Sequence, residues 1–205
     1  MSRVPDAQPD RSELVILDAG PILNFLGRKE TATLYLDTLQ FMTDQIIVPD
    51  AVVDEVAQKS LKDRRFDLCN RKLASMIGSN YIVELTTPNK LTNDDYDFEW
   101  AWVVNNCPAS MANSGRNRGE MVLLAHARLI QKQGRDVVAM IDDQDAIRLA
   151  NKAGIPSFTT VDLFEESVLH GLITSRSELK RLYSLVANQD DGLLAFNLTG
   201  LTNAF

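Results

Sequence analysis

The stretch Leu14-Val-Ile-Leu-Asp-Ala-Gly-Pro-Ile-Leu-Asn-Phe-Leu26 decides how this sequence folds. It opens with an apolar run that stops abruptly at Asp18, which is typical of a strand buried on both faces of a parallel sheet. Gly20 suits a tight turn, and Pro21 suits the first position of a helix because its missing N–H has no intrahelical partner there. The stretch therefore predicts strand, turn and helix. Asp18 would then lie at the carboxyl edge of the sheet, where open α/β sheets bind their ligands.

The same alternation of apolar runs and helix-like segments continues through most of the chain. Strands are predicted over 14–17, 45–49, 81–85, 136–141 and 155–160. Helices are predicted over 21–26, 31–42, 51–57, 88–104, 119–132, 146–154, 161–172 and 176–186. Asp50 is a good N-cap for the helix at 51–57. Glu84 interrupts the run at 81–85 and indicates a strand nearer an edge of the sheet. The acids of 88–104 are expected mainly at the surface. The alternation predicts an α/β fold with a central parallel sheet and helices on both faces.

Length and composition indicate one domain. The chain has 205 residues, of which 45% are hydrophobic and 24% charged, as in ordinary globular proteins. Residues 1–13 are polar and predict a flexible arm, 14–188 predict the folded domain, and 189–205 predict a tail that packs back or binds a partner. No stretch has the apolar length of a signal peptide or a membrane span, and Cys69 and Cys107 form no disulfide or metal pattern. We therefore expect a cytoplasmic protein with no membrane partner.

The charge of the chain limits how it could bind nucleic acid. The net charge is -7, so a global basic field is absent. Between Lys59 and Lys72, however, six basic residues stand against two acidic ones, a local charge of +4. This segment is either a solvated helix face or a patch that contacts phosphate.

Four acids are predicted to meet at the carboxyl edge of the sheet. Asp18 and Asp142 come directly after predicted strands, and Glu55 and Glu120 lie in early helical turns that could lean over the same edge. Neighbouring carboxylates raise one another's pKa unless a counter-charge is present. A divalent cation is the simplest counter-charge, and ligands that are all oxygen favour Mg²⁺ or Mn²⁺.

The residues beside these acids have simpler interpretations. Asp143 suits the N-cap of the next helix, and Asp145 suits a first-turn acid favoured by the helix dipole, although it could also be a further metal ligand. Residues 105–118 are rich in Asn, Ser and Gly and form the most loop-like internal segment. Its Arg116 and Arg118 could steer a phosphate or could be solvated.

Four segments also resemble the motifs of PIN-domain nucleases, a family that includes the VapC toxins. They are residues 14–23, 48–56, 119–125 and 140–150, they occur in the family's order, and the resemblance extends over residues 14–172. It implies a PIN-like three-layer α/β/α fold and a catalytic cluster of Asp18, Glu55, Glu120 and Asp142. It also implies Mg²⁺ or Mn²⁺, RNA phosphodiesters as substrate, a homodimer and a cognate antitoxin. Gly20 departs from the Ser or Thr that many members carry two residues after the first acid.

The expected mechanism is metal-assisted hydrolysis. One or two cations held by Asp18, Glu120 and Asp142 would lower the pKa of a bound water and orient the scissile phosphate, with Glu55 completing the cluster. Asp145 is a candidate for a further ligand.

Two other classes of function are consistent with parts of the sequence. The first is a non-catalytic PIN-like module that binds RNA or protein and would be indifferent to Asp18→Asn. The second is a response-regulator-like domain, which needs a lysine at the end of a late strand, and Ser157-Phe-Thr-Thr160 supplies none. Gly-x-Ser-x-Gly, Walker and Gly-x-Gly-x-x-Gly motifs are absent, and His126 and His170 lie on helices without a partner at ligand spacing.

Overall fold

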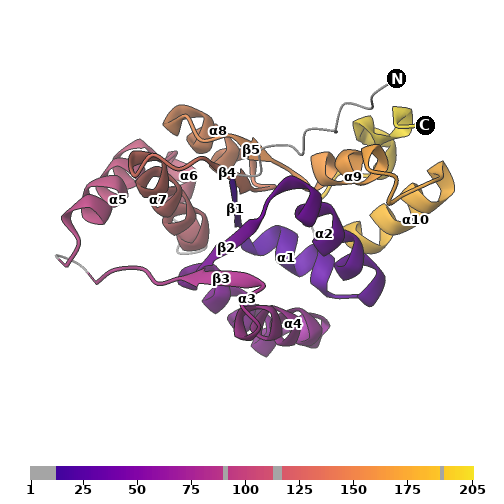
Figure 1. Ribbon diagram of the computed structural model, residues 1–205, viewed down its shortest axis with the longest axis horizontal. Helices are drawn as coiled ribbons and strands as arrows, with labels where there is room; N and C mark the ends of the chain where they lie inside the picture. Colours follow the sequence, from indigo (N-terminus) through magenta and orange to yellow (C-terminus); the bar gives the residue numbers. More distant parts are fainter. Residues whose placement is uncertain (1–12, 90–91, 113–116, 190–191) are drawn as a thin grey trace, which may run out of the picture.

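The computed structural model describes residues 13–89, 92–112, 117–189 and 192–205 (Figure 1). The strands are β1 (Leu14–Leu17), β2 (Gln45–Pro49), β3 (Ile82–Leu85), β4 (Val137–Met140) and β5 (Ser157–Phe158). The helices are α1 (Ala19–Leu26), α2 (Lys29–Met42), α3 (Asp50–Lys62), α4 (Asp67–Gly78), α5 (Asp94–Asn106), α6 (Ala109–Ala112), α7 (Arg118–Lys132), α8 (Gln144–Ala153), α9 (Thr160–Leu169) and α10 (Arg176–Ala187). Three short 3₁₀ helices are η1 (Arg64–Phe66), η3 (Phe196–Leu198) and η4 (Gly200–Asn203).

The five strands form one parallel sheet in the order β3-β2-β1-β4-β5. β1 lies at its centre, with Leu14 opposite Gln45 of β2 on one side and Leu17 opposite Met140 of β4 on the other. β3 is an edge strand, as the interrupting Glu84 predicts. All of the predicted strands are present, and the largest difference is β5, which has only two residues in the sheet.

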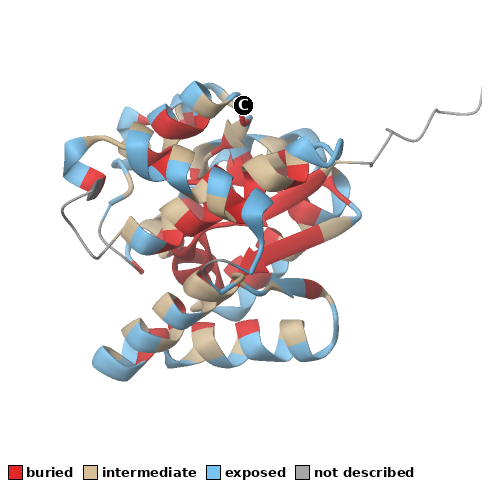
Figure 2. Ribbon diagram, turned by 90° about the vertical axis from the view of Figure 1, so that its left-hand side faces the viewer, coloured by how far each residue is buried: buried red, intermediate tan, exposed pale blue. Residues whose placement is uncertain are grey.

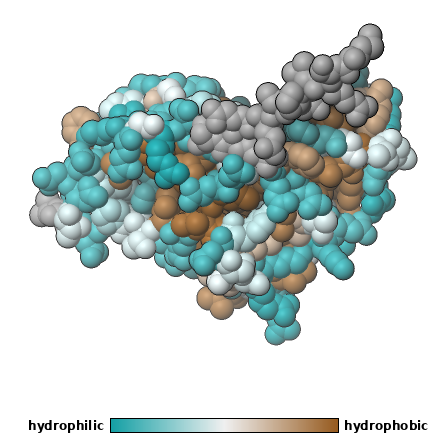
Figure 3. All heavy atoms as spheres, viewed as in Figure 1, coloured by the Kyte–Doolittle hydropathy of each residue, from teal (hydrophilic) through white to brown (hydrophobic). Residues whose placement is uncertain are grey.

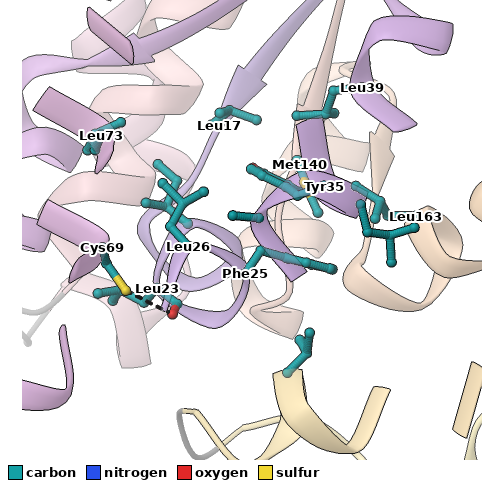
Figure 4. Packing of buried hydrophobic residues seen from close by; sticks show 14 of the residues in the cluster. Leu17, Leu23, Phe25, Leu26, Tyr35, Leu39, Cys69, Leu73, Met140 and Leu163 are labelled. Carbon is teal, nitrogen blue, oxygen red and sulfur yellow. Dashed lines mark hydrogen bonds between the residues drawn. The ribbon is translucent and has the colours of Figure 1, made fainter. Parts of the chain in front are cut away.

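Helices cover both faces of the sheet, so the fold has three layers. Because successive side chains of a strand point to opposite faces, Val15 and Leu17 pack into one core and Leu14 and Ile16 into the other. The first core takes apolar residues from α1–α4, α9 and α10, and the second takes them from α5, α7 and α8. Figure 2 shows the buried strands between these layers, and Figure 4 shows Phe25 and Tyr35 close together below Leu17, with Leu23 beside Cys69. The predicted α/β class and parallel sheet are confirmed.

Three local predictions were wrong: two helices begin earlier than expected, and a segment expected to be a loop contains a helix. α1 begins at Ala19, with only Asp18 between it and the strand, so Gly20 lies inside the helix and Pro21 is its third residue. Pro21 is tolerated there because the first four N–H groups of a helix lack intrahelical acceptors. Asp50 is the first residue of α3 and Pro49 is its N-cap. The segment 105–118, expected to be a loop, contains α6, and its residues 113–116 lie outside the described part.

One acid of α5 is not at the surface. Glu99 is only 4% exposed, and its Oε2 accepts a hydrogen bond from Nε of Arg128 at 2.7 Å. Arg128 also stacks over the ring of Trp102, with 3.8 Å between its guanidinium carbon and the ring centroid. A buried carboxylate is tolerated only with such a partner.

The C-terminal segment packs beside α9 and α10 (Figure 1). The hydroxyl of Tyr183 donates to the carbonyl of Leu194 at 2.7 Å, and Leu201 is fully buried. Gln189 lies against Gly27 so closely that a Cβ there would be 2.3 Å from its Nε2. The segment is therefore joined to the domain's core, and Gln189 meets the C-terminal end of α1.

In the face shown in Figure 3, hydrophilic residues dominate and apolar ones are seen in patches between them. Within the described ranges, the helices fall short of the length and apolar character that crossing a bilayer requires.

Candidate active site

The strand order defines where a site should lie. From β1 the chain moves outward to β2 and β3 on one side, and then returns to place β4 and β5 on the other side. The change of direction falls between β1 and β4, and ligands of open α/β sheets bind outside the carboxyl ends of the strands at such a point. Asp18 follows β1 directly, and its N–H donates to the carbonyl of Met140 at the end of β4 at 3.2 Å. Asp142 follows β4 after one intervening residue, so both acids lie at this crevice.

Asp18 is buried, and one of its two carboxylate oxygens has no hydrogen-bond partner among the described residues. It is the N-cap of α1, and its Oδ2 accepts from the N–H of Gly20 at 3.4 Å. Its Oδ1 is fully buried and has no hydrogen-bond partner among the described residues. Burial, and then the negative charges of Glu55 and Asp142, raise the pKa of Asp18 to about 7, although the backbone N–H groups oppose the shift. Capping alone therefore does not account for this residue.

Glu120 faces the same crevice from the first turn of α7. Its Oε2 is buried and has no hydrogen-bond partner in the described chain. Burial raises the pKa of Glu120 to about 8, and the charges of Asp18 and Glu55 add to the shift. A neutral carboxylic acid is the less costly form here unless a cation is bound.

Glu55 reaches the cluster because Gly119 has no side chain. Glu55 lies in the second turn of α3, and a Cβ on Gly119 would be only 2.8 Å from its Oε2. Its other oxygen, Oε1, lies 3.9 Å from Nζ of Lys59, one turn further along α3. The close approach of α3 and α7 thus places the Glu55 carboxylate beside Glu120.

Asp142 is held by a residue that the sequence did not single out. The backbone N–H of Thr160 donates to Oδ1 of Asp142 at 2.7 Å, and the hydroxyl of Thr160 donates to Oδ2 at 2.7 Å. Burial raises the pKa of Asp142, and these two bonds act in the opposite direction. Thr160 therefore fixes the orientation of Asp142, and each carboxylate oxygen retains a further lone pair for another partner.

These side chains line an open cavity of about 390 Å³. Its lining residues are Asp18, Gly20, Asn24, Glu55, Lys59, Glu120, Asp142, Asp143, Gln144, Gly192 and Leu193. All four acids of the predicted cluster are in this set. A hollow of about 420 Å³ lined by Asp37, Gln40, Phe41 and Leu172 contains none of them.

The acids next to Asp142 have separate places. Oδ1 of Asp143 accepts from the N–H of Ala146 at 2.8 Å, which confirms Asp143 as the N-cap of α8. Asp145 lies in the first turn of α8, accepts from the hydroxyl of Ser110 at 2.5 Å and pairs with Arg148. It does not line the cavity, so the structure does not bring it into the cluster as the suggested further metal ligand.

Of the two arginines proposed to steer phosphate, only Arg118 belongs to the part of the chain that the structure describes. Arg118 is the first residue of α7, is exposed and does not line the cavity. Arg116 lies outside the described residues. The arginine contribution to substrate binding therefore remains a prediction.

The two histidines lie away from the acids, as expected for structural residues. His126 is buried against the ring of Tyr96, with 4.9 Å between the centroids, and burial lowers its pKa to about 4. His170 stacks on Phe41 at 4.5 Å. Neither ring lines the cavity.

Sequence reasoning missed five residues of the cavity wall, namely Asn24, Lys59, Gln144, Gly192 and Leu193. Asn24 is the one polar side chain in α1 and lies one helical turn after Gly20, a spacing that could have identified it. Lys59 was considered only within the basic segment. Gly192 and Leu193 come from the C-terminal segment, and their position depends on long-range packing that no local pattern reveals.

The side chains of the cavity offer the kind of ligand atoms that a hard divalent cation binds. Its acids offer oxygen atoms alone, and Asp18 and Glu120 each have an oxygen without a partner. As the side chains stand, no three His, Cys, Asp or Glu residues of the described chain form a group that could hold a metal ion. Without a cation the carboxylates repel one another and stand apart. Their side chains would have to rotate toward a cation to bind it.

Comparison of the chain with protein-family models and with curated protein sequences gave no match. The fold and the cavity therefore define the class: an α/β protein with a central parallel sheet between helices and an acidic cavity at its topological switch point.

Proposed function

We propose that this protein is a metal-dependent ribonuclease with a PIN-like fold, which hydrolyses RNA phosphodiester bonds with Mg²⁺ or Mn²⁺. One observation carries the proposal. Four acids from four separate elements line one cavity at the switch point, and two of them have buried oxygens with no partner. Burying neighbouring carboxylates, which repel one another, costs free energy, and such clusters are typical of functional sites.

Each side chain would have a distinct part in the reaction. Asp18, Glu120 and Asp142 would bind the cation, with Asp142 held in orientation by Thr160. Glu55, the acid that pairs with Lys59, would accept a proton from the attacking water or hold that water by a hydrogen bond. When bound, the cation supplies charge stabilisation at the scissile phosphate.

The position of the basic segment supports a nucleic acid as the substrate. Lys59 lines the cavity, Lys62 is exposed one turn further along α3, and η1 adds the exposed Arg64. The carbonyl of Arg65 accepts from Nε2 of Gln189 at 3.1 Å, which ties η1 to the segment that lines the cavity mouth. A basic strip leading away from an acidic cavity suits a phosphate backbone whose scissile bond lies at the acids.

The biological role rests on the sequence resemblance alone. The chain would be the toxin of a toxin-antitoxin pair, would act as a homodimer in the cytoplasm and would be silenced by a cognate antitoxin. The choice of RNA over DNA has the same basis.

The test is cleavage of a mixed RNA pool by the purified protein with Mg²⁺ or Mn²⁺. Asp18→Asn and Asp142→Asn should each reduce the rate by at least about a thousandfold, because each removes charge that the cation needs. EDTA should have the same effect. Asp145→Asn is a matched control on the same segment and should retain activity within a few-fold, since its side chain faces Ser110 and Arg148.

A different pattern would reject the proposal. Cleavage that persists in EDTA or in both cluster variants would point to a contaminating nuclease. Failure of the wild-type protein to cut RNA or bind a cation would favour a non-catalytic binding module.

A further inference from the structure

Asn24 has the environment of a ligand-binding residue. It lies in the middle of α1, whose other residues are apolar or glycine, and it is only 6% exposed. Its side chain lines the acidic cavity, and its amide Oδ1 is fully buried with no hydrogen-bond partner in the described chain. A buried amide oxygen without a partner is destabilising, so apolar packing does not explain an asparagine at this position.

The neighbouring atoms identify what the cavity would bind. Three of its side chains have a buried oxygen with no partner, namely Oδ1 of Asp18, Oε2 of Glu120 and Oδ1 of Asn24. An amide oxygen and an ionised carboxylate oxygen only accept, so they offer nothing to the oxygens of a phosphate. They require either a proton donor or a cation. Lys59, the cation of the cavity wall, lies 3.9 Å from Glu55 and is not bonded to any of these three oxygens.

We propose that Asn24 is a neutral oxygen ligand of the divalent cation that Asp18 and Glu120 bind, an inference that rests on the function proposed above. Amide oxygens are hard ligands of the kind that Mg²⁺ and Mn²⁺ accept. An asparagine adds a ligand without adding to the repulsion among the four acids. α1 carries Asp18 at its N-cap and Asn24 on its second turn, so one rigid helix presents both.

The experiment measures Mn²⁺ affinity by calorimetry at pH 8, without substrate, for the wild-type protein and three variants. Asn24→Leu keeps a similar shape but removes the oxygen, and it should weaken binding roughly 10–100-fold, as loss of a supporting group in a metal site does. Asn24→Asp retains an oxygen and should bind at least as tightly as the wild-type protein. Gln144→Leu removes the exposed amide of the same cavity and should bind within about twofold of wild type.

Thermal unfolding separates a ligand from a structural residue. In EDTA, Asn24→Leu should melt no lower than the wild-type protein, because it removes an unpartnered polar group. Saturating Mn²⁺ should raise the melting temperature of the variant less than that of the wild-type protein.

Two results would overturn the inference while leaving the proposed function intact. One is Mn²⁺ affinity of Asn24→Leu within twofold of a wild-type protein that binds well. The other, decisive if Asn24→Leu does not fold, is weaker binding by Asn24→Asp than by wild type. Absence of Mn²⁺ binding by the wild-type protein would instead reject both the inference and the proposed function.

Discussion

Replacing Asp18 by Asn should stabilise the cation-free protein at pH 8, although it should abolish activity. The carboxyl of Asp18 has a pKa of about 7 in the fold, against 3.8 for the free side chain. Between these values the folded state holds a proton that the unfolded state has lost, so the stability due to this group falls as the pH rises. Asparagine carries no charge in either state and caps a helix as well as aspartate does.

The magnitude follows from the difference between the two pKa values. A difference of about three units corresponds to about 4 kcal/mol at 1.36 kcal/mol per unit. Because the charges of Glu55 and Asp142 contribute to the raised pKa of Asp18, part of this free energy belongs to those repulsions and not to Asp18 alone. We therefore expect Asp18→Asn to unfold with about 2–4 kcal/mol more free energy than the wild-type protein above pH 7. The advantage should shrink to near zero at pH 4.

Urea unfolding in EDTA, followed by circular dichroism at pH 5, 6.5 and 8, measures the effect. Asp54→Asn, which removes an exposed carboxylate from α3, is the control and should change the free energy of unfolding by less than about 0.5 kcal/mol. Adding Mg²⁺ at pH 8 should stabilise the wild-type protein but not Asp18→Asn. An advantage of the same size at pH 5 and pH 8 would refute the reasoning, because it could not arise from charge.

Gly119→Ala should reduce Mn²⁺ affinity and RNA cleavage roughly tenfold, because its methyl group would lie 2.8 Å from the Glu55 carboxylate and displace it. Calorimetry and cleavage rates measure the two effects. Unchanged values would show that the Glu55 side chain can move aside without loss of function. His126→Gln should remove an acid-dependent loss of stability. The pKa of His126 is about 4 rather than 6.5, so the stability from its neutral ring is complete above pH 6.5 and falls by up to about 3 kcal/mol toward pH 4 in urea unfolding. Replacing Lys62 and Arg64 together by Gln should reduce the magnitude of the slope of log affinity for RNA against log salt by about 1.4. Fluorescence anisotropy in EDTA measures this slope. An unchanged slope would mean that the RNA binds elsewhere.

The strands and two acids of the cavity were predictable because they follow from short-range rules. An apolar run that stops at an acid, found at Asp18 and again before Asp142, locates the ends of buried parallel strands, and the parallel arrangement brings those ends together. The helix boundaries were less predictable. At Asp50 the helix begins directly after the strand, and at Ala19 it begins one residue after it, whereas the turn and cap residues predict later starts.

Thr160 and the C-terminal part of the cavity wall, which the sequence did not predict, depend on contacts between distant residues. Thr160 binds Asp142 across 18 positions of sequence, and Gln189 meets Gly27 where the end of α10 lies against α1. Asp145, in contrast, is close to Asp142 in the sequence but does not join the acidic cluster. It is three residues from Asp142, but the first turn of α8 directs its side chain to Ser110 and Arg148. Proximity in the sequence therefore did not predict membership of the cluster.

The charges of the molecule fit together if the cavity is a cation site. With the acids ionised and no cation, the cavity would repel a phosphate, and the chain's net charge of -7 would add to the repulsion. A bound divalent cation would offset two of the four negative charges and present a positive centre to the scissile phosphate, and the basic strip from Lys59 to Arg64 would act on the flanking phosphates. Binding of RNA should then require the cation more strongly near the cavity than along the strip. A short oligonucleotide that spans only the cavity should lose nearly all affinity in EDTA, whereas a longer one that also reaches Lys62 should retain part of it. Equal losses for both lengths would mean that the strip does not contact the substrate.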